Sequence, residues 1–306
     1  MAKRYDCIIV GLGPCGIGCA VKLHDAGINF AIVEKGAPGG KVNIAPRVDN
    51  YPGQTKIPGP DLAFILYERI LERNIEVIGD EVVSLRKDNE GFELQLANDT
   101  IYAKTVLLAS GTTERKLGLD KEDRLLGHGV SYCALCDGHF FKGKDILVVG
   151  GGNSALKEAI YLAKRVNHLT LIHRRDQFRG LNHLVDELKE NQNVEVLTPY
   201  IPLEILGEEK VEGVRIKNVA TNEEKVIEVE GLFPLVGQIP NTQFIDIENV
   251  KDEWGTVPVD KAFQTSCVGL FAGGDILPRE IRQIYLAEHD GMVAAKNIIE
   301  YLKNQK

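Results

Sequence analysis

Near its N-terminus the chain reads Tyr5-Asp6-Cys7-Ile8-Ile9-Val10-Gly11-Leu12-Gly13-Pro14-Cys15-Gly16, and an apolar helical stretch follows to about Ala26. A second strand is expected over residues 29–33, ending at Glu34. In such a unit one glycine allows the tight turn, one lets the backbone approach a pyrophosphate, and one permits close packing of helix on strand. The helix N-terminus offers unpaired N–H groups and a positive dipole end to phosphates. The stretch therefore predicts a dinucleotide-binding α/β fold.

The same pattern occurs a second time. A strand is predicted over residues 145–149, a helix to about Arg165 and a further strand over 169–172, ending at His173. The turn between the first strand and the helix reads Gly150-Gly151-Gly152-Asn153-Ser154-Ala155, and the separation of Gly150 from His173 equals that of Gly11 from Glu34. A single glycine fingerprint is weak, but two copies in the strand–turn–helix–strand context are strong. We predict two Rossmann-like, three-layer nucleotide-binding domains.

The residues at the ends of the second strands distinguish the two ligands. Glu34 lies where a ribose hydroxyl would be bound, whereas the second copy has His173-Arg174-Arg175, with Arg179 one helical turn further on. A carboxylate repels a 2′-phosphate and arginines bind it. We predict FAD, with NAD as the alternative, at the first site and NADPH at the second. A solvated basic helix start would explain Arg179 alone, but not the whole cluster.

A cysteine pair lies between the two fingerprints, in Ser131-Tyr132-Cys133-Ala134-Leu135-Cys136-Asp137-Gly138. Side chains three residues apart on a helical turn are ~5–6 Å apart, which suits a disulfide. The spacing also tends to lower the pKa of one thiol and so makes it a nucleophile in disulfide exchange. Asp137 has two open roles: it carries the proton for the leaving thiolate, or it caps a helix or turn.

A zinc site is the rival interpretation of this segment. Two sulfur and two nitrogen ligands are present in His128, Cys133, Cys136 and His139, but the longer stretch that normally separates a Cys pair from a His pair is missing. We therefore predict no metal. The remaining cysteines, Cys7, Cys15, Cys19 and Cys267, are expected in strands or helices as small buried hydrophobic residues.

Composition excludes several classes of protein. The 306 residues exceed what one hydrophobic core usually serves, so two domains are expected. A net charge of −8 argues against a general nucleic-acid binder. No apolar run approaches the ~20 residues of a membrane helix, and the N-terminus runs straight into a strand where a signal peptide would have its apolar region. We expect a cytoplasmic protein without a nucleic-acid or membrane partner.

With these motifs in this order, the chain resembles the low-molecular-weight thioredoxin reductases over essentially its full length. The most specific element is Cys-x-x-Cys-Asp just before the second fingerprint. The other matching segments are 11–16, 50–53, 150–155, 173–179, 237–242, Gly273-Gly274-Asp275-Ile276 and Arg282-Gln283.

The resemblance implies an NADPH-dependent thioredoxin-disulfide reductase that passes electrons through FAD and the Cys133–Cys136 pair to thioredoxin, working as a homodimer. It places Cys136 against the flavin, Asp275 on the FAD ribityl chain, and the N-terminus of a helix beginning near Arg282 toward the flavin. Asn50 and the loop Gly39-Gly40-Lys41 would line the FAD. The cofactor-binding residues expected in all are Gly11, Gly13, Pro14, Gly16, Glu34, Lys35, Gly40, Lys41, Asn50, Gly111, Gly150, Gly152, Asn153, Ser154, His173, Arg174, Arg175, Arg179, Gly237, Asp275, Ile276, Arg282, Gln283 and Ile284.

The chain departs from the family at four positions. Lys41 replaces the usual Gln, Ser110 a common Thr, and Cys15 and Gly273 each replace an Ala. Lys41 could bring positive charge to the flavin or its phosphates; we favour a solvent-facing side chain.

The resemblance also predicts the domain order: an FAD domain over 1–112 plus 242–306, and an inserted NADPH domain over 113–241. Residues 221–233 are strand-like and are expected to close the insertion, and 237–241 is expected as the return linker.

Two other functions compete with this prediction. A ferredoxin or quinone reductase of similar build would not need the cysteines. A non-catalytic flavoprotein sensor would not need the arginine cluster.

Overall fold

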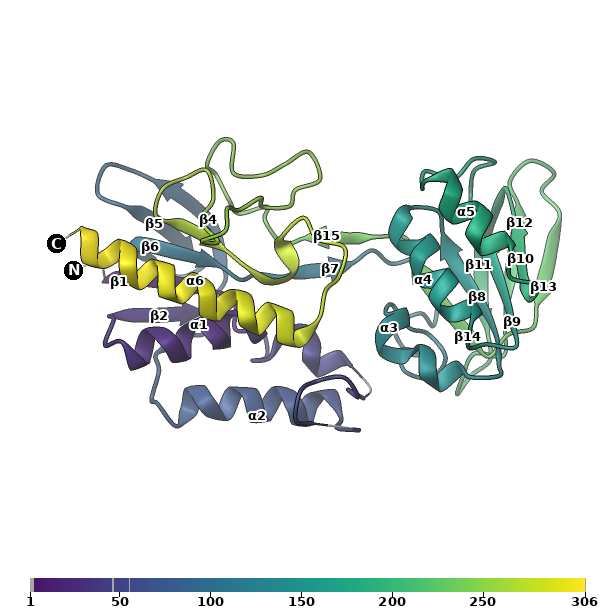
Figure 1. Ribbon diagram of the computed structural model, residues 1–306, viewed down its shortest axis with the longest axis horizontal. Coiled ribbons are helices and arrows are strands. Elements are labelled where there is room, and N and C mark those ends of the chain that lie inside the picture. The colour runs from purple at the N-terminus through teal and green to yellow at the C-terminus, as the bar shows by residue number, and fades with distance from the viewer. Residues whose placement is uncertain (1–2, 46, 55, 306) are drawn as a thin grey trace. The chain divides into compact units, whose positions relative to one another are not determined.

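The computed structural model describes residues 3–45, 47–54 and 56–305 and divides into two compact units. The first unit comprises Met1–Thr113 and Ile239–Lys306, and the second comprises Glu114–Gln238. The second unit is thus inserted into the first along the chain. Both are α/β units (Figure 1).

The first unit is built on one mixed sheet. Strands β1, β2, β3, β6 and β16 run parallel, and β4 and β5 extend the sheet in antiparallel fashion from β6. The order is β3 (Val77–Ile78), β2 (Phe30–Val33), β1 (Arg4–Val10), β6 (Thr100–Leu108), β5 (Phe92–Leu96) and β4 (Val82–Lys87), with β16 (Leu270–Ala272) also paired with β6.

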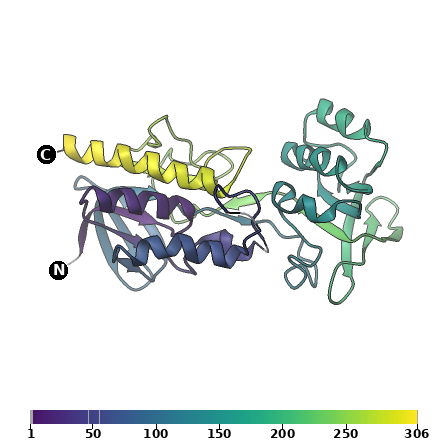
Figure 2. The ribbon, with the colours of Figure 1, turned by 60° about the horizontal axis from the view of Figure 1, so that its bottom comes forward.

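Both faces of this sheet are buried, as a parallel sheet requires. Cys7 and Ile9 of β1 belong to a core shared with α1 (Pro14–Asp25), α2 (Gly59–Leu71) and α6 (Ile284–Asn304), whereas Ile8 and Val10 belong to the core on the other face. Figure 2 shows the long C-terminal helix α6 lying alongside α1. The return segment therefore completes the first unit.

The second unit has three layers. A parallel sheet in the order β10 (Val194–Leu197), β9 (His168–Ile172), β8 (Asp145–Gly150) and β14 (Gly231–Leu235) packs on one face against α3 (Ala134–Asp137), α4 (Asn153–Ala163) and α5 (Asn182–Lys189). Its other face packs against an antiparallel sheet of β11 (Tyr200–Leu206), β12 (Gly213–Asn218) and β13 (Glu224–Ile227). Two Rossmann-like α/β domains are thereby confirmed.

The end of the insertion is strand-like, as predicted, and is divided between two strands. Residues 221–233 form two strands, β13 and β14, in different sheets. Val226 is exposed on the outer antiparallel sheet, whereas Leu232 and Phe233 are fully buried in the parallel sheet, so the two halves suit different layers. The segment 237–241 returns the chain from the second unit to the first, as predicted, and within it β15 (Gln238–Pro240) pairs with β7 (Thr112–Glu114).

Candidate functional site

The glycines of the first fingerprint have different surroundings. Gly11 has a φ of +105°, and a methyl group there would lie 2.5 Å from the Ala109 carbonyl oxygen. A methyl group on Gly16 would lie 2.0 Å from the Gly11 carbonyl oxygen. Gly13 has an ordinary extended backbone and no atom within 4 Å of the position of a Cβ. Gly11 and Gly16 therefore serve the fold, and Gly13 faces the open space that a pyrophosphate would need.

The helices after both fingerprints begin in the same way. Neither α1 nor α4 has a side-chain N-cap or an acidic residue in its first turn, and α1 has Pro14 at its start. Gly152, the N-cap of α4, also has an ordinary extended backbone and open space at its Cβ position. The first N–H groups of each helix are thus left for an anion.

Glu34 directly follows β2 and stabilises the turn of the first fingerprint by hydrogen bonds. Its Oε2 accepts a hydrogen bond from the Leu12 N–H at 2.7 Å, and its Oε1 accepts one from the Gly36 N–H at 2.7 Å. A carboxylate has about four acceptor sites, so Glu34 keeps capacity for ribose hydroxyls. Lys35 is directed elsewhere, to an ion pair with Glu81 at 2.8 Å.

The end of β9 carries the basic cluster. Arg174, Arg175 and Arg179 are exposed, and within the described ranges none of them has an acidic partner. The helical-turn position expected for Arg179 was wrong: it lies in the loop before α5, where its N–H donates to the Gly151 carbonyl at 2.9 Å. This bond fixes the arginine-bearing loop directly to the glycine turn, which favours a shared phosphate-containing ligand.

His173 is buried beneath this cluster. Its ring stacks on Phe178 with centroids 5.2 Å apart, and its Nε2 has no hydrogen-bond partner in the described part of the chain. Burial lowers the pKa of His173, and Arg179 and Arg175 lower it further. A methyl group on Gly151 would overlap the imidazole, so His173 supports the turn that precedes α4.

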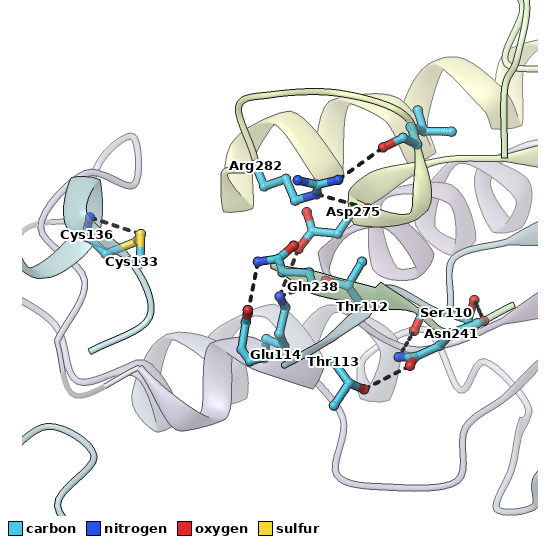
Figure 3. Close-up of polar contacts among 12 residues, drawn as sticks. Ser110, Thr112, Thr113, Glu114, Cys133, Cys136, Gln238, Asn241, Asp275 and Arg282 are labelled. Atoms are coloured by element: carbon cyan, nitrogen blue, oxygen red, sulfur yellow. Dashed lines mark hydrogen bonds and ion pairs between the residues drawn. A yellow bond between two sulfur atoms is a disulfide. The ribbon is translucent and has the colours of Figure 1, made fainter. Parts of the chain in front are cut away.

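The predicted cysteine pair is a disulfide. Cys133 is the N-cap of α3, its Cα lies 5.3 Å from that of Cys136, and its Sγ accepts the Cys136 N–H at 3.1 Å (Figure 3). Asp137 ends the same short helix and is buried, and its Oδ2 accepts the Ser131 hydroxyl at 2.6 Å. The turn thus directs the Cys136 N–H at the sulfur of Cys133 and carries a buried carboxyl group close in sequence.

Two further carboxylates hold this turn, and sequence analysis missed both. Glu158 of α4 accepts the Ala134 N–H at 3.0 Å. Buried Glu122 accepts the Tyr132 hydroxyl at 2.7 Å and main-chain N–H groups of residues 117–119. The sequence offered one signal for Glu158. This residue lies one helical turn after the buried Ala155, on the same helix face, where an acidic residue is unusual.

In the first unit, Lys41 contradicts the solvent-facing expectation. It lies in the 3₁₀ turn η1 (Gly40–Ile44), and its ammonium group is 2.9 Å from Thr112 Oγ1 and 3.5 Å from Asp275 Oδ2. Asp275 itself lies in the 3₁₀ turn η3 (Gly274–Ile276). Two segments that are distant in sequence therefore meet through one ion pair.

Other predicted FAD residues gather around η3 and the start of α6. Arg282 Nε donates to the Asp275 main-chain carbonyl at 3.1 Å (Figure 3), and Asn50 Nδ2 donates to Gln283 Oε1 at 2.7 Å. The helix begins at Ile284, two residues later than expected, because Arg282 is used to bind the turn and Gln283 is the N-cap. Ile276 has a fully buried side chain, so only its main chain can face a ligand.

The connecting strands contain the two other predicted glycines. Gly111 and Gly237 have φ values of +66° and +110°, which favour glycine. Asn241 binds next to Gly111, accepting the Ser110 hydroxyl at its main-chain oxygen at 2.6 Å and donating from Nδ2 to the Ser110 carbonyl at 3.0 Å (Figure 3). The Ser110 departure thus keeps a hydroxyl that is used.

Two more departures occupy one place. A methyl group on Gly273 would lie 2.7 Å from Cys15 Sγ. The sulfur of Cys15 therefore fills the space that the usual alanine at 273 would need, and the two changes compensate each other. Cys7, Cys15 and Cys19 are buried, as predicted, but Cys267 is half-buried and lies in a loop.

The described residues contain no group of three or more His, Cys, Asp and Glu side chains that could hold a metal ion. None of the helices in those ranges is long and apolar enough to span a bilayer.

Known proteins resemble the chain over its whole length. It is 37% identical over 301 residues to a thioredoxin reductase of Ureaplasma parvum, covering 97% of each chain. The crystal structure of thioredoxin reductase from Streptococcus pyogenes matches with a TM-score of 0.93 and 37% identity, covering 99% of this chain and 100% of that one. A ferredoxin-flavin thioredoxin reductase from Clostridium acetobutylicum matches with a TM-score of 0.54 and 29% identity, covering 99% and 100%.

These matches confirm the resemblance inferred from the motifs. Over residues 5–291 the sequence matches a single family, so the chain belongs to the pyridine nucleotide-disulphide oxidoreductases.

Proposed function

We propose that this protein is an NADPH-dependent thioredoxin-disulfide reductase. Electrons would pass from NADPH through bound FAD to Cys133–Cys136 and then to the disulfide of thioredoxin. The observation that carries the proposal is the Cys133–Cys136 disulfide, which lies at the start of a helical turn. The same chain has two glycine fingerprints with open space for a pyrophosphate, one followed by an acidic residue and the other by arginines. The relatives that match over nearly the full length are named thioredoxin reductases.

FAD fits the first unit. Gly13 and the uncapped start of α1 would take the pyrophosphate, and Glu34 the adenosine ribose. Asp275, held by Arg282 at its main chain, would bind the ribityl hydroxyls. The flavin, when bound, supplies the hydride and electron chemistry, while the protein supplies orientation and electrostatics.

NADPH fits the second unit. Gly152 and the start of α4 would take its pyrophosphate. The unpaired guanidinium groups of Arg174, Arg175 and Arg179 would bind the 2′-phosphate, which a carboxylate in the place of His173 would repel. Accordingly we assign 1–112 with 242–306 to FAD and 113–241 to NADPH.

The cysteines would perform the exchange. After reduction, a thiolate on Cys133 is favoured because the Cys136 N–H donates to that sulfur. This thiolate attacks the partner's disulfide and forms a mixed disulfide, which the Cys136 sulfur then resolves, releasing the reduced partner. Asp137 would carry the proton to the leaving thiolate.

One assay tests the proposal. The yellow protein is mixed with NADPH and oxidised thioredoxin, and NADPH consumption is followed at its absorbance band. We expect consumption that depends on thioredoxin, and a Cys136→Ser variant that keeps FAD and accepts electrons from NADPH but no longer reduces thioredoxin. Full thioredoxin reduction by that variant would refute the cysteine assignment, and a protein that cannot be loaded with flavin would refute the whole proposal.

The electron donor is tested in the same assay. One structural relative is named for ferredoxin, and the arginine cluster at the end of β9 is what favours NADPH here. Replacing NADPH by reduced ferredoxin should give no thioredoxin reduction.

Three accompanying properties belong to the proposal. The family resemblance supports a homodimer, which sedimentation velocity would test. Buried free cysteines beside a single redox disulfide support a reducing compartment, the cytoplasm. No nucleic-acid partner is expected at a net charge of −8.

A further inference from the structure

Glu158 of α4 forms a hydrogen bond with the short turn that carries the Cys133–Cys136 disulfide. Its Oε2 accepts the N–H of Ala134, the first residue of α3. The residue directly before Ala134 is Cys133, the N-cap of the helix. The same helix end also donates the Cys136 N–H to that sulfur at 3.1 Å. The carboxyl group of Glu158 and the sulfur of Cys133 therefore accept two different N–H groups of one short turn.

The protonation of Glu158 is balanced near neutral pH. Burial raises the pKa of Glu158 to about 7, the Ala134 N–H lowers it and the Glu114 carboxylate raises it. The nearest other charged residues along these two helices are Asp137 at the end of α3, which accepts the Ser131 hydroxyl, and Lys157, which precedes Glu158 in α4. A second negative charge placed at the same turn would therefore favour the protonated form of Glu158.

Reduction of the disulfide places such a charge there. When the S–S bond breaks and two electrons enter, Cys136 takes one proton as a thiol and Cys133 is left as a thiolate. The thiolate and a Glu158 carboxylate, each bound to an N–H group of the same short turn, would then repel each other.

We propose that Glu158 is a positioning residue of the dithiol relay that takes up the second proton when Cys133–Cys136 is reduced and returns it when the disulfide forms again. As a carboxylate it holds the Ala134 N–H next to the disulfide; as a neutral acid it places no negative charge at the turn that carries the Cys133 thiolate. Two electrons and two protons then enter together, with one proton on Cys136 and one on Glu158. The inference rests on the proposed dithiol function, with the reductant being the reduced flavin of that proposal.

The test measures how many protons accompany reduction. The holoenzyme is equilibrated in dithiothreitol redox buffers from about pH 6 to about pH 9, a range that brackets an ordinary cysteine pKa. The Cys133–Cys136 state is then trapped by alkylation and counted by mass. Since neither NADPH nor thioredoxin is present, a failure here is distinguishable from a failure of the proposed function.

We compare the wild-type protein with Glu158→Gln, which can still accept the Ala134 N–H, and with the exposed-site control Glu187→Gln on α5, which changes the net charge equally. Above about pH 7 the wild type and Glu187→Gln should keep two protons per two electrons, and Glu158→Gln should fall toward one. In a second measurement, ultraviolet thiolate absorbance of the reduced protein should show a lower Cys133 pKa in Glu158→Gln. Identical proton counts and identical thiolate titrations in wild type and Glu158→Gln, with FAD content equal, would overturn the proposal.

Discussion

The β1–α1–β2 and β8–α4–β9 segments are two copies of one strand–turn–helix–strand unit, and they differ most at the end of the second strand. Both begin with a glycine that faces open space, Gly13 or Gly152, and a helix without a side-chain cap. At the end of the second strand, Glu34 closes back on the Leu12 N–H, whereas the other copy presents exposed arginines above buried His173. Under the proposed function, the shared part would bind a pyrophosphate, and the strand end would decide which nucleotide carries it.

The largest expected effect comes from removing that difference in charge. Replacing Arg174 and Arg175 together by Ala should lower the preference for NADPH over NADH, as a ratio of kcat/KM, by about 10²- to 10⁴-fold, since charge-assisted bonds contribute ~1.5–3 kcal/mol each. The FAD content should not change. Arg165→Ala, whose guanidinium lies over the Tyr161 ring in the same unit, removes one positive charge outside the cluster and is the control. Equal losses with NADPH and NADH would show that the arginines do not read the 2′-phosphate.

The shared part can be broken one copy at a time. Gly13→Ala should weaken FAD binding and Gly152→Ala should raise the KM for NADPH, each by about 10- to 100-fold, because a methyl group would occupy the phosphate's space at a cost of ~1–3 kcal/mol. Both glycines have backbone angles that alanine adopts, and a Cβ added at either position would have no neighbouring atom within 4 Å. The unfolding midpoints of the apoproteins should therefore match wild type. An effect of Gly152→Ala on flavin retention as large as that of Gly13→Ala would contradict the assignment of one nucleotide to each copy.

The two copies also differ in what covers the helix. In the first unit α1 packs against the return segment, where Cys15 Sγ fills the space beside Gly273, and this pair offers a double-mutant cycle. Gly273→Ala alone should destabilise the protein by about 1–3 kcal/mol through overpacking. Cys15→Ala with Gly273→Ala should recover most of that loss, giving a favourable coupling energy of about 1 kcal/mol or more. Thermal unfolding of the four proteins measures it, and simple additivity would mean that the two departures are independent.

Features that depend on neighbouring residues were predictable from the sequence. The glycine turns and the Cys133–Cys136 disulfide follow from short spacings, because a helical turn and a strand–turn–helix unit bring those atoms together whatever the rest of the chain does. The residues at the strand ends, Glu34 and His173, were placed correctly for the same reason.

Features that depend on distant partners were not predictable. Lys41 was expected in solvent, but Asp275 and Thr112, which hold its ammonium group, come from strands and turns far along the chain. Glu158 looked like an ordinary helix acid until the fold brought Ala134 beside it. Arg179 was expected one helical turn after the strand end, yet it lies in a loop, where its N–H donates to the Gly151 carbonyl. Periodicity does not report such tertiary bonds.

The smallest expected effect concerns Lys41 of the first unit, whose ammonium group lies beside Thr112 and Asp275. In Lys41→Gln, the amide can still donate to Asp275 Oδ2 or Thr112 Oγ1, so FAD affinity should change by less than about 10-fold. The positive charge of Lys41 favours the electron-rich reduced flavin, and the substitution removes that charge. The midpoint potential of the bound flavin should therefore fall, on the order of 10–30 mV for a partly exposed ammonium group. Lys35→Gln removes an exposed lysine that is paired with Glu81 and should change the potential less. Dye-equilibrated photoreduction measures both, and an unchanged or higher potential in Lys41→Gln would mean that Asp275 already cancels the charge of Lys41 at the flavin.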